Sequence, residues 1–138
     1  MSNADGLARS RFHRSLATAG LALGDLLVLG AFLTVGSINH GVDPITMPGR
    51  VAGTIAPFLV GWVVAALVAG AYASDATRTV GTAVLRAVTT WIPAAAIGLT
   101  LRSTDFFHGS SPVTFILVIS IVGTVCFSAW RGLVAYAR

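Results

Sequence analysis

One carboxylate lies in the middle of a long apolar stretch, and it is the residue of this sequence best placed to do chemistry. Asp25 interrupts the run from Leu16 to Ile38, which holds no other charged residue. A carboxylate inside a bilayer is costly unless it is protonated, wetted or paired with a cation. Arg131, near the end of the fourth apolar run, and Arg86, near the start of the third, are predicted to lie at a similar depth.

Asp25 therefore has two interpretations. In the first it forms an intramembrane ion pair that fastens its helix to the helix carrying Arg131 or Arg86. In the second it is a coupling site, where a proton or ion binds during transport. The sequence supplies both cations and no second acid within the apolar runs. That composition favours the ion pair, although it leaves the choice of arginine open.

Two histidines form a weaker constellation. His40 and His108 follow the first and third apolar runs, so they are predicted at the same side of the membrane and could form a site there. Facing imidazoles could bind a metal or the iron of a haem. The further donors would have to be Asp43 or Asp105, and the spacing matches no zinc signature. We therefore expect loop or interfacial histidines, with no metal and no cofactor.

Catalytic motifs are absent from the sequence. It contains no Gly-rich phosphate loop, no HExxH, no CxxC and no recognisable Ser-His-Asp set. Its single cysteine, Cys126, lies inside an apolar run and cannot form an intramolecular disulfide. The sequence thus predicts a protein that is not an enzyme.

The elements that must position these residues follow from composition. Of 138 residues, 55% are hydrophobic and 10% are charged, whereas soluble domains average about 25% charged residues. Four apolar runs cover residues 16–38, 51–73, 81–101 and 112–135, each long enough to cross about 30 Å of hydrocarbon as a helix. We predict an all-α membrane protein, with a basic tail at 1–15 and a single four-helix transmembrane domain at 16–138.

Arginine placement predicts the orientation. The sequence has nine Arg, five Asp and neither Lys nor Glu. If the spans alternate in direction, seven arginines fall on one side and only Arg50 and Arg102 on the other. The positive-inside rule then places both termini in the cytoplasm. The arginines flank apolar runs instead of forming a patch, so we expect the lipid bilayer as partner and no nucleic acid.

A weak internal repeat accompanies the four spans. Shifting the chain by 68 residues aligns the His-Gly-x-x-Pro motif at His40 with that at His108, and Trp62 with Trp130. Two tandem helical hairpins related by a parallel pseudo-two-fold axis would explain the match. Chance matching in a biased composition explains it equally well.

Small residues and aromatics indicate how the helices pack. Rows at a spacing of four let backbones approach one another in lipid, and Tyr72 is expected in an interfacial aromatic belt. The rows in the four spans are Gly20 and Gly24, with Ala17 and Ala31 nearby; Gly61, Ala65 and Ala69; Thr90, Ala94 and Gly98; and Ser120, Thr124, Ser128 and Gly132.

Six short blocks follow one another along the chain: Gly24-Asp25-Leu26-Leu27, Ser37-Ile38-Asn39-His40-Gly41, Ala56-Pro57-Phe58-Leu59-Val60-Gly61-Trp62, Gly98-Leu99-Thr100-Leu101-Arg102, Pro112-Val113-Thr114-Phe115 and Trp130-Arg131. In this order and spacing they resemble the prokaryotic membrane family called domain of unknown function 3054. The resemblance implies four helices and a prokaryotic membrane, and it implies no activity and no site residues.

Two classes of function remain. The first is a non-enzymatic structural or accessory component of the cell membrane, self-associating as a homo-oligomer or joined to other membrane subunits. The second is a small proton- or ion-coupled transporter or channel that uses Asp25. Four-helix exporters of the small multidrug resistance type also place one acid in their first helix. Their dual-topology members need a weak charge bias, unlike the seven-to-two bias of this chain.

Overall fold

The computed structural model describes residues 15–107 and 111–137, and these residues form four long helices. They are α2 (Leu16–Asn39), α3 (Pro48–Ala69), α4 (Val80–Arg102) and α5 (Val113–Ala137). All four are long and apolar enough to cross a membrane. The helical fold and the number of spans agree with the sequence prediction, and the chain is a multi-pass membrane protein in its architecture.

Local signals explain where the helices begin and end. Ser15 and Thr79 cap α2 and α4, each accepting a hydrogen bond from a backbone N–H three residues later. Pro48 stands in the first turn of α3, where its missing N–H costs nothing. Gly70 ends that helix in the left-handed conformation. The span predicted at 51–73 is therefore shifted to 48–69.

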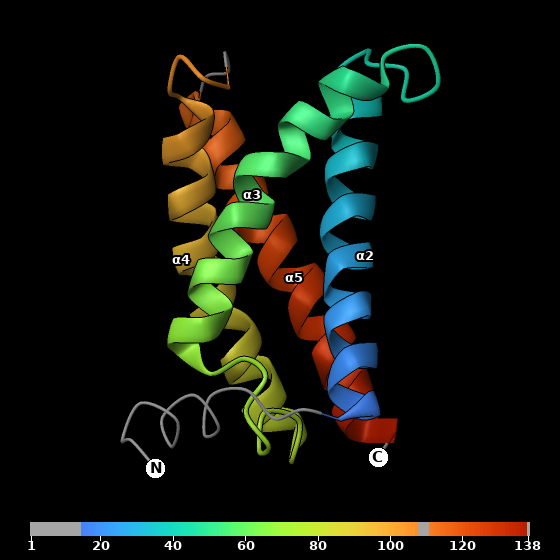
Figure 1. Ribbon diagram of the computed structural model, residues 1–138, viewed down its shortest axis with the longest axis vertical. Helices are drawn as coiled ribbons and strands as arrows, with labels where there is room; N and C mark the ends of the chain where they lie inside the picture. The colour runs from blue at the N-terminus through green and yellow to red at the C-terminus, as the bar shows by residue number, and fades with distance from the viewer. Residues whose placement is uncertain (1–14, 108–110, 138) are drawn as a thin grey trace.

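The helices surround a common axis in chain order. In the described residues α3 packs extensively on α4 and α4 on α5, while α2 makes smaller contacts with α3 and α5 and none between backbones with α4. Figure 1 shows α5 crossing behind the bundle, approaching α2 at the bottom and leaving it at the top. The lower end, where α2 begins and α5 ends, is called the terminal end below; the upper end is called the hairpin end.

Aromatic side chains fill the centre of the bundle. Trp62 stacks on Phe127 with ring centroids 4.4 Å apart, and Trp91 lies 5.1 Å from the same ring. Phe32 meets Trp91 edge to face at 5.5 Å, which joins α2 to α4 through side chains. Large apolar side chains such as Leu27, Val68 and Leu133 point outward, where lipid would cover them.

Close helix contacts occur where glycine stands opposite a bulky group. A Cβ at Gly61 would overlap the Ala94 carbonyl, so α3 and α4 meet backbone to backbone there. Gly61, Ala94 and Gly98 of the rows predicted on these two helices thus lie at their mutual contact. On α5, a Cβ at Gly123, which lies outside the predicted row, would overlap the Trp91 ring.

Candidate functional site

Asp25 and Arg131 form a buried, two-pronged ion pair. Arg131 Nη2 donates to Asp25 Oδ2 at 2.7 Å, and Arg131 Nε donates to Oδ1 at 3.1 Å. Both side chains are 0% exposed. Side-by-side pairing of a guanidinium with a carboxylate is the strongest geometry available to these groups. It joins the middle of α2 to the last turns of α5.

Neighbouring groups complete the network. Tyr72 Oη donates to Asp25 Oδ2 at 2.7 Å and accepts from Trp62 Nε1 at 3.0 Å. Arg131 Nη1 donates to the Ala71 carbonyl at 2.8 Å. The guanidinium carbon also lies 5.3 Å from the Tyr72 ring centre and 5.7 Å from that of Trp62. Three of the four helices and the segment after α3 therefore contribute to one polar cluster.

Tyr72 belongs to the segment that follows α3, outside the helices. Burial and the neighbouring charge of Asp25 raise the pKa of its hydroxyl above the usual range. The hydroxyl therefore stays protonated and acts as a donor to the carboxylate. Sequence reasoning expected Tyr72 in an interfacial belt, but the side chain is 8% exposed. The signal that it missed is Gly70, which ends α3 early, so that Tyr72 follows the helix and its side chain is buried against Asp25 and Trp62.

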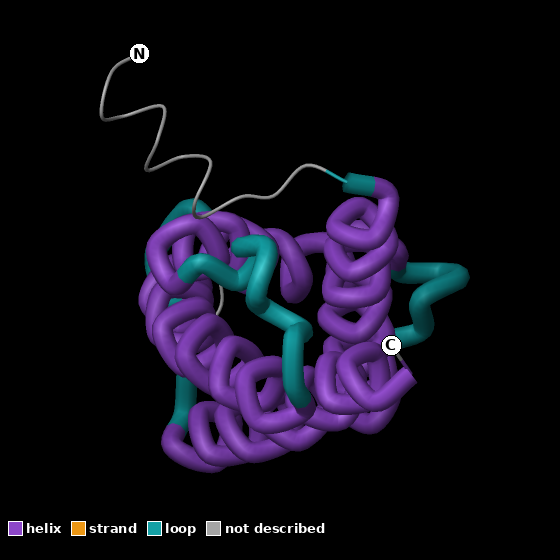
Figure 2. The backbone as a smooth tube through the Cα atoms, turned by 90° about the horizontal axis from the view of Figure 1, so that it is seen from below, coloured by secondary structure: helices purple, strands orange, loops and turns teal. Residues whose placement is uncertain are grey.

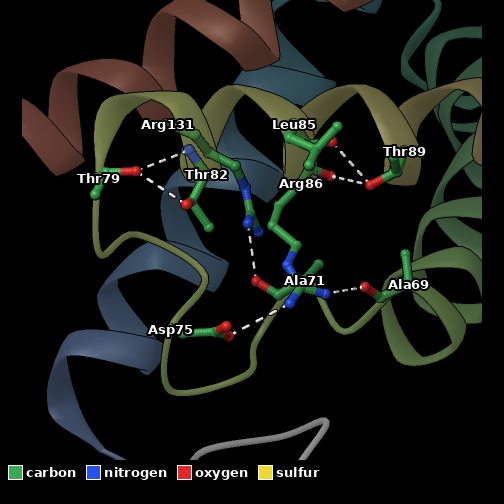
Figure 3. A network of polar contacts seen from close by, with 9 residues as sticks. All are labelled: Ala69, Ala71, Asp75, Thr79, Thr82, Leu85, Arg86, Thr89 and Arg131. Atoms are coloured by element: carbon green, nitrogen blue, oxygen red, sulfur yellow. Dashed lines mark hydrogen bonds and ion pairs between the residues drawn. The ribbon is translucent and has the colours of Figure 1, made fainter.

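Arg86 serves a different group. Its Nη1 donates to the Ala69 carbonyl at 2.5 Å, and its Nη2 lies 3.4 Å from Asp75 Oδ1. Figure 3 shows Arg86 and Arg131 reaching two nearby carbonyls, Arg86 that of Ala69, the last residue of α3, and Arg131 that of Ala71 just beyond the helix. Carbonyls at a helix C-terminus lack intrahelical partners and carry partial negative charge. Arg86 thus caps α3, and the structure places Arg131 alone of the two arginines against Asp25.

A glycine makes room for the network on α2. A Cβ at Gly24 would overlap the Trp130 ring, so the indole packs directly against the helix backbone beside Asp25. Gly24 and Asp25 are both buried, whereas Leu26 and Leu27 are exposed. The short block Gly24-Asp25 therefore marks the face of α2 that meets α5.

The histidine site receives no support from the described residues. His40 is exposed after α2, and His108 lies outside the described residues. No group of three or more His, Cys, Asp or Glu side chains in the described part of the chain could hold a metal ion.

The chemical capacity of the buried cluster is low because its atoms are already engaged. Both Asp25 oxygens accept hydrogen bonds, and Nε, Nη1 and Nη2 of Arg131 all donate. A cavity of about 150 Å³ at the terminal end reaches Tyr72, and a larger one at the hairpin end begins at Val28. Neither of these two cavities is lined by Asp25 or Arg131.

Comparison with known proteins gives one finding of relationship. No curated protein and no solved structure matches the chain. A family model, described as protein of unknown function (DUF3054), matches residues 22–134. That range contains Asp25, Tyr72, Arg86 and Arg131. The chain belongs to the DUF3054 family.

Proposed function

We propose that this protein is a non-enzymatic structural or accessory component of the cell membrane. The Asp25–Arg131 pair carries the proposal, because its geometry is that of a fastening between helices. Both side chains are fully buried and every charged atom has a protein partner. A carboxylate used for coupling must exchange its proton or ion with water during each transport cycle. The full burial and the hydrogen bonds of Asp25 hinder this exchange.

The alternative, a proton- or ion-coupled transporter, has one observation in its favour. The small cavity at the terminal end stops at Tyr72, whose hydroxyl is bonded to Asp25. A rotation of the Tyr72 side chain would bring water to the carboxylate. The structural role remains the better supported one, because Arg131 already supplies the countercharge that a transported cation would replace.

Proton movement in proteoliposomes separates the two functions. The purified protein is reconstituted with a trapped pH-sensitive dye, and a membrane potential is imposed. The structural role predicts the same proton leak as protein-free liposomes of equal lipid composition. A leak well above that level would favour the transporter, provided that the variant Asp25→Asn/Arg131→Met abolishes it while remaining folded.

We also propose that both termini are cytoplasmic. The support is the seven-to-two arginine bias and the even number of spans. Exposed Gly41 and Ser74 lie at opposite ends of the bundle, so each can carry a single cysteine in a Cys126→Ser background. An impermeant maleimide added to intact cells should label Gly41→Cys and not Ser74→Cys. The reverse pattern would contradict the proposed orientation.

The pseudo-two-fold axis remains a proposal as well. The cyclic order of α2, α3, α4 and α5 is the order that two hairpins related by an axis along the bundle would give. Figure 2, a view along the bundle from the terminal end, shows this ring of helices with the connection between α3 and α4 crossing it. An experimental structure in which the hairpins superpose only at an offset other than 68 residues would contradict the repeat.

A further inference from the structure

A large groove opens between α2 and α5 at the hairpin end. Its volume is about 960 Å³, within the range of small-molecule sites. The Asp25–Arg131 pair joins the two helices, and Figure 1 shows α5 diverging from α2 toward the hairpin end. The groove is the space that this divergence leaves.

The groove is apolar along its length and polar at its mouth. Val28, Phe32, Val118, Val122 and Cys126 line its deep part. The mouth is lined by the end of α2, the start of α3, the end of α4 and the start of α5, with the polar side chains Asn39, His40, Arg50, Thr54, Arg102 and Thr114. No carboxylate is among its lining residues in the described part of the chain.

Two arginines at the mouth make the groove amphipathic. Arg50 and Arg102 are the same two residues that depart from the arginine bias of the chain. The Arg102 guanidinium carbon lies 4.4 Å from the centre of the Phe115 ring, and Phe115 is itself part of the groove wall. Both arginines of the groove lining thus lie at its mouth, where the groove meets the headgroup region.

The length of the groove matches one leaflet of a bilayer. Its lining on α2 runs from Val28 to His40, and on α5 from Thr114 to Cys126. Each stretch rises about 18 Å at 1.5 Å per residue. Half of the hydrocarbon core is about 15 Å thick. The apolar part therefore has the depth of one acyl chain layer.

We propose that the α2–α5 groove binds an anionic phospholipid of the surrounding leaflet, with an acyl chain along the apolar wall and the headgroup phosphate at Arg50 and Arg102. A second copy of this chain is a poorer occupant. In a parallel arrangement it would bring its own Arg50 and Arg102 against the same positive mouth. An anionic lipid complements both the charge and the apolar depth.

Native mass spectrometry of the detergent-solubilised protein tests the proposal. The probes are phosphatidylglycerol and phosphatidylcholine with identical acyl chains. We expect phosphatidylglycerol to be retained preferentially, and each of Arg50→Gln and Arg102→Gln to lower that preference about fivefold. Arg78→Gln is the matched control, because Arg78 is an exposed arginine at the other end of the bundle. If Arg78→Gln and Arg102→Gln lowered the preference for phosphatidylglycerol equally, the proposed binding of the headgroup at the mouth would be overturned.

A second pair of variants tests the acyl chain. Gly36 lines the groove and Gly20 lies on the same helix away from it; a Cβ at either would meet no atom within 4 Å. Gly36→Leu should reduce retention of both lipids several-fold, and Gly20→Leu should leave it unchanged. Unchanged retention in Gly36→Leu would refute the acyl chain position.

Two further outcomes would replace the lipid by another occupant. Displacement of the bound lipid by soluble glycerophosphoglycerol would show that the site recognises only the anion. A dimer that is lost in Gly36→Leu, with no lipid retained by the wild type, would identify a second copy as the occupant. Either result overturns the proposal.

Discussion

Replacing Asp25 by Asn removes one charge without changing the size of the side chain. The carboxylate accepts three hydrogen bonds, two from Arg131 and one from Tyr72. The amide oxygen of Asn can still accept some of these hydrogen bonds. The amide N–H₂ group, in contrast, would face the remaining N–H and O–H donors and could not accept from them. Arg131, 0% exposed, would keep its charge without a counter-ion.

The size of the effect follows from these contacts. Hydrogen bonds between membrane helices contribute about 0.6 to 1.7 kcal/mol each, and breaking a buried ion pair in a soluble protein costs about 3–5 kcal/mol. With three bonds to the carboxylate disturbed, we expect Asp25→Asn to lower the free energy of unfolding by about 3 kcal/mol. Unfolding in mixed micelles of increasing denaturing detergent, followed by tryptophan fluorescence, measures this loss.

A double-mutant cycle identifies the partner. Asp25→Asn/Arg131→Met removes both charges, so the double variant should be more stable than the two single losses predict, by about 2 kcal/mol. Arg86→Met is the matched control, because Arg86 binds Ala69 and Asp75 instead. The loss of unfolding free energy caused by Arg86→Met should therefore simply add to the loss caused by Asp25→Asn. Additive losses with Arg131→Met, or wild-type stability of Asp25→Asn, would refute the structural role.

Three other substitutions test the contacts that support the network, with the same unfolding measurement. Gly61→Ala should cost about 1–3 kcal/mol because its Cβ would overlap the Ala94 carbonyl, whereas Gly53→Ala, with no neighbour within 4 Å, should not destabilise. Gly70→Ala should cost more than Gly41→Ala: both have positive φ, but only at Gly70 would the Cβ also press on Arg86 Nη1, at 2.8 Å. Tyr72→Phe should cost about 1–2 kcal/mol by leaving the Trp62 N–H without its acceptor, and Tyr136→Phe, which changes an 83% exposed side chain, should cost nothing measurable. Equal effects within any of these pairs would contradict the contact concerned.

The fold could be predicted from the sequence because lipid leaves the backbone few choices. Four apolar runs of sufficient length can satisfy their hydrogen bonds only as helices, and the structure places helices in all four. The boundary of α3 could have been predicted more closely. Pro48 and Gly70 are a proline in the first turn and a left-handed glycine after the last, which are the usual signals for a start and an end.

The pairing of Asp25 depended on helix order, which hydropathy does not contain. Judged only by their predicted depth in the membrane, Arg131 and Arg86 are equally plausible partners of Asp25. In the described residues the backbone of α5 approaches that of α2, whereas α4 reaches α2 only through side chains, so Arg131 and not Arg86 reaches Asp25. The buried face of α5 was also open to prediction. An arginine inside a span should face protein, and Arg131 shares its face with Ile119, Gly123, Phe127 and Ala135 at a spacing of four.

The polar network matters most for α2 because that helix has few other attachments. Water drives no association between helices in lipid, so close backbone packing or polar contacts must hold each one. A Cβ at Gly20, Gly30 or Gly36 would meet nothing within 4 Å, and of the α2 glycines only Gly24 lies against a neighbour, Trp130. α3 and α4, by contrast, meet backbone to backbone at Gly61 and Ala94. The ion pair therefore fixes α2 at one depth, and the part of α2 beyond it, which packs on the core through Leu29, Phe32 and Leu33, forms one wall of the groove.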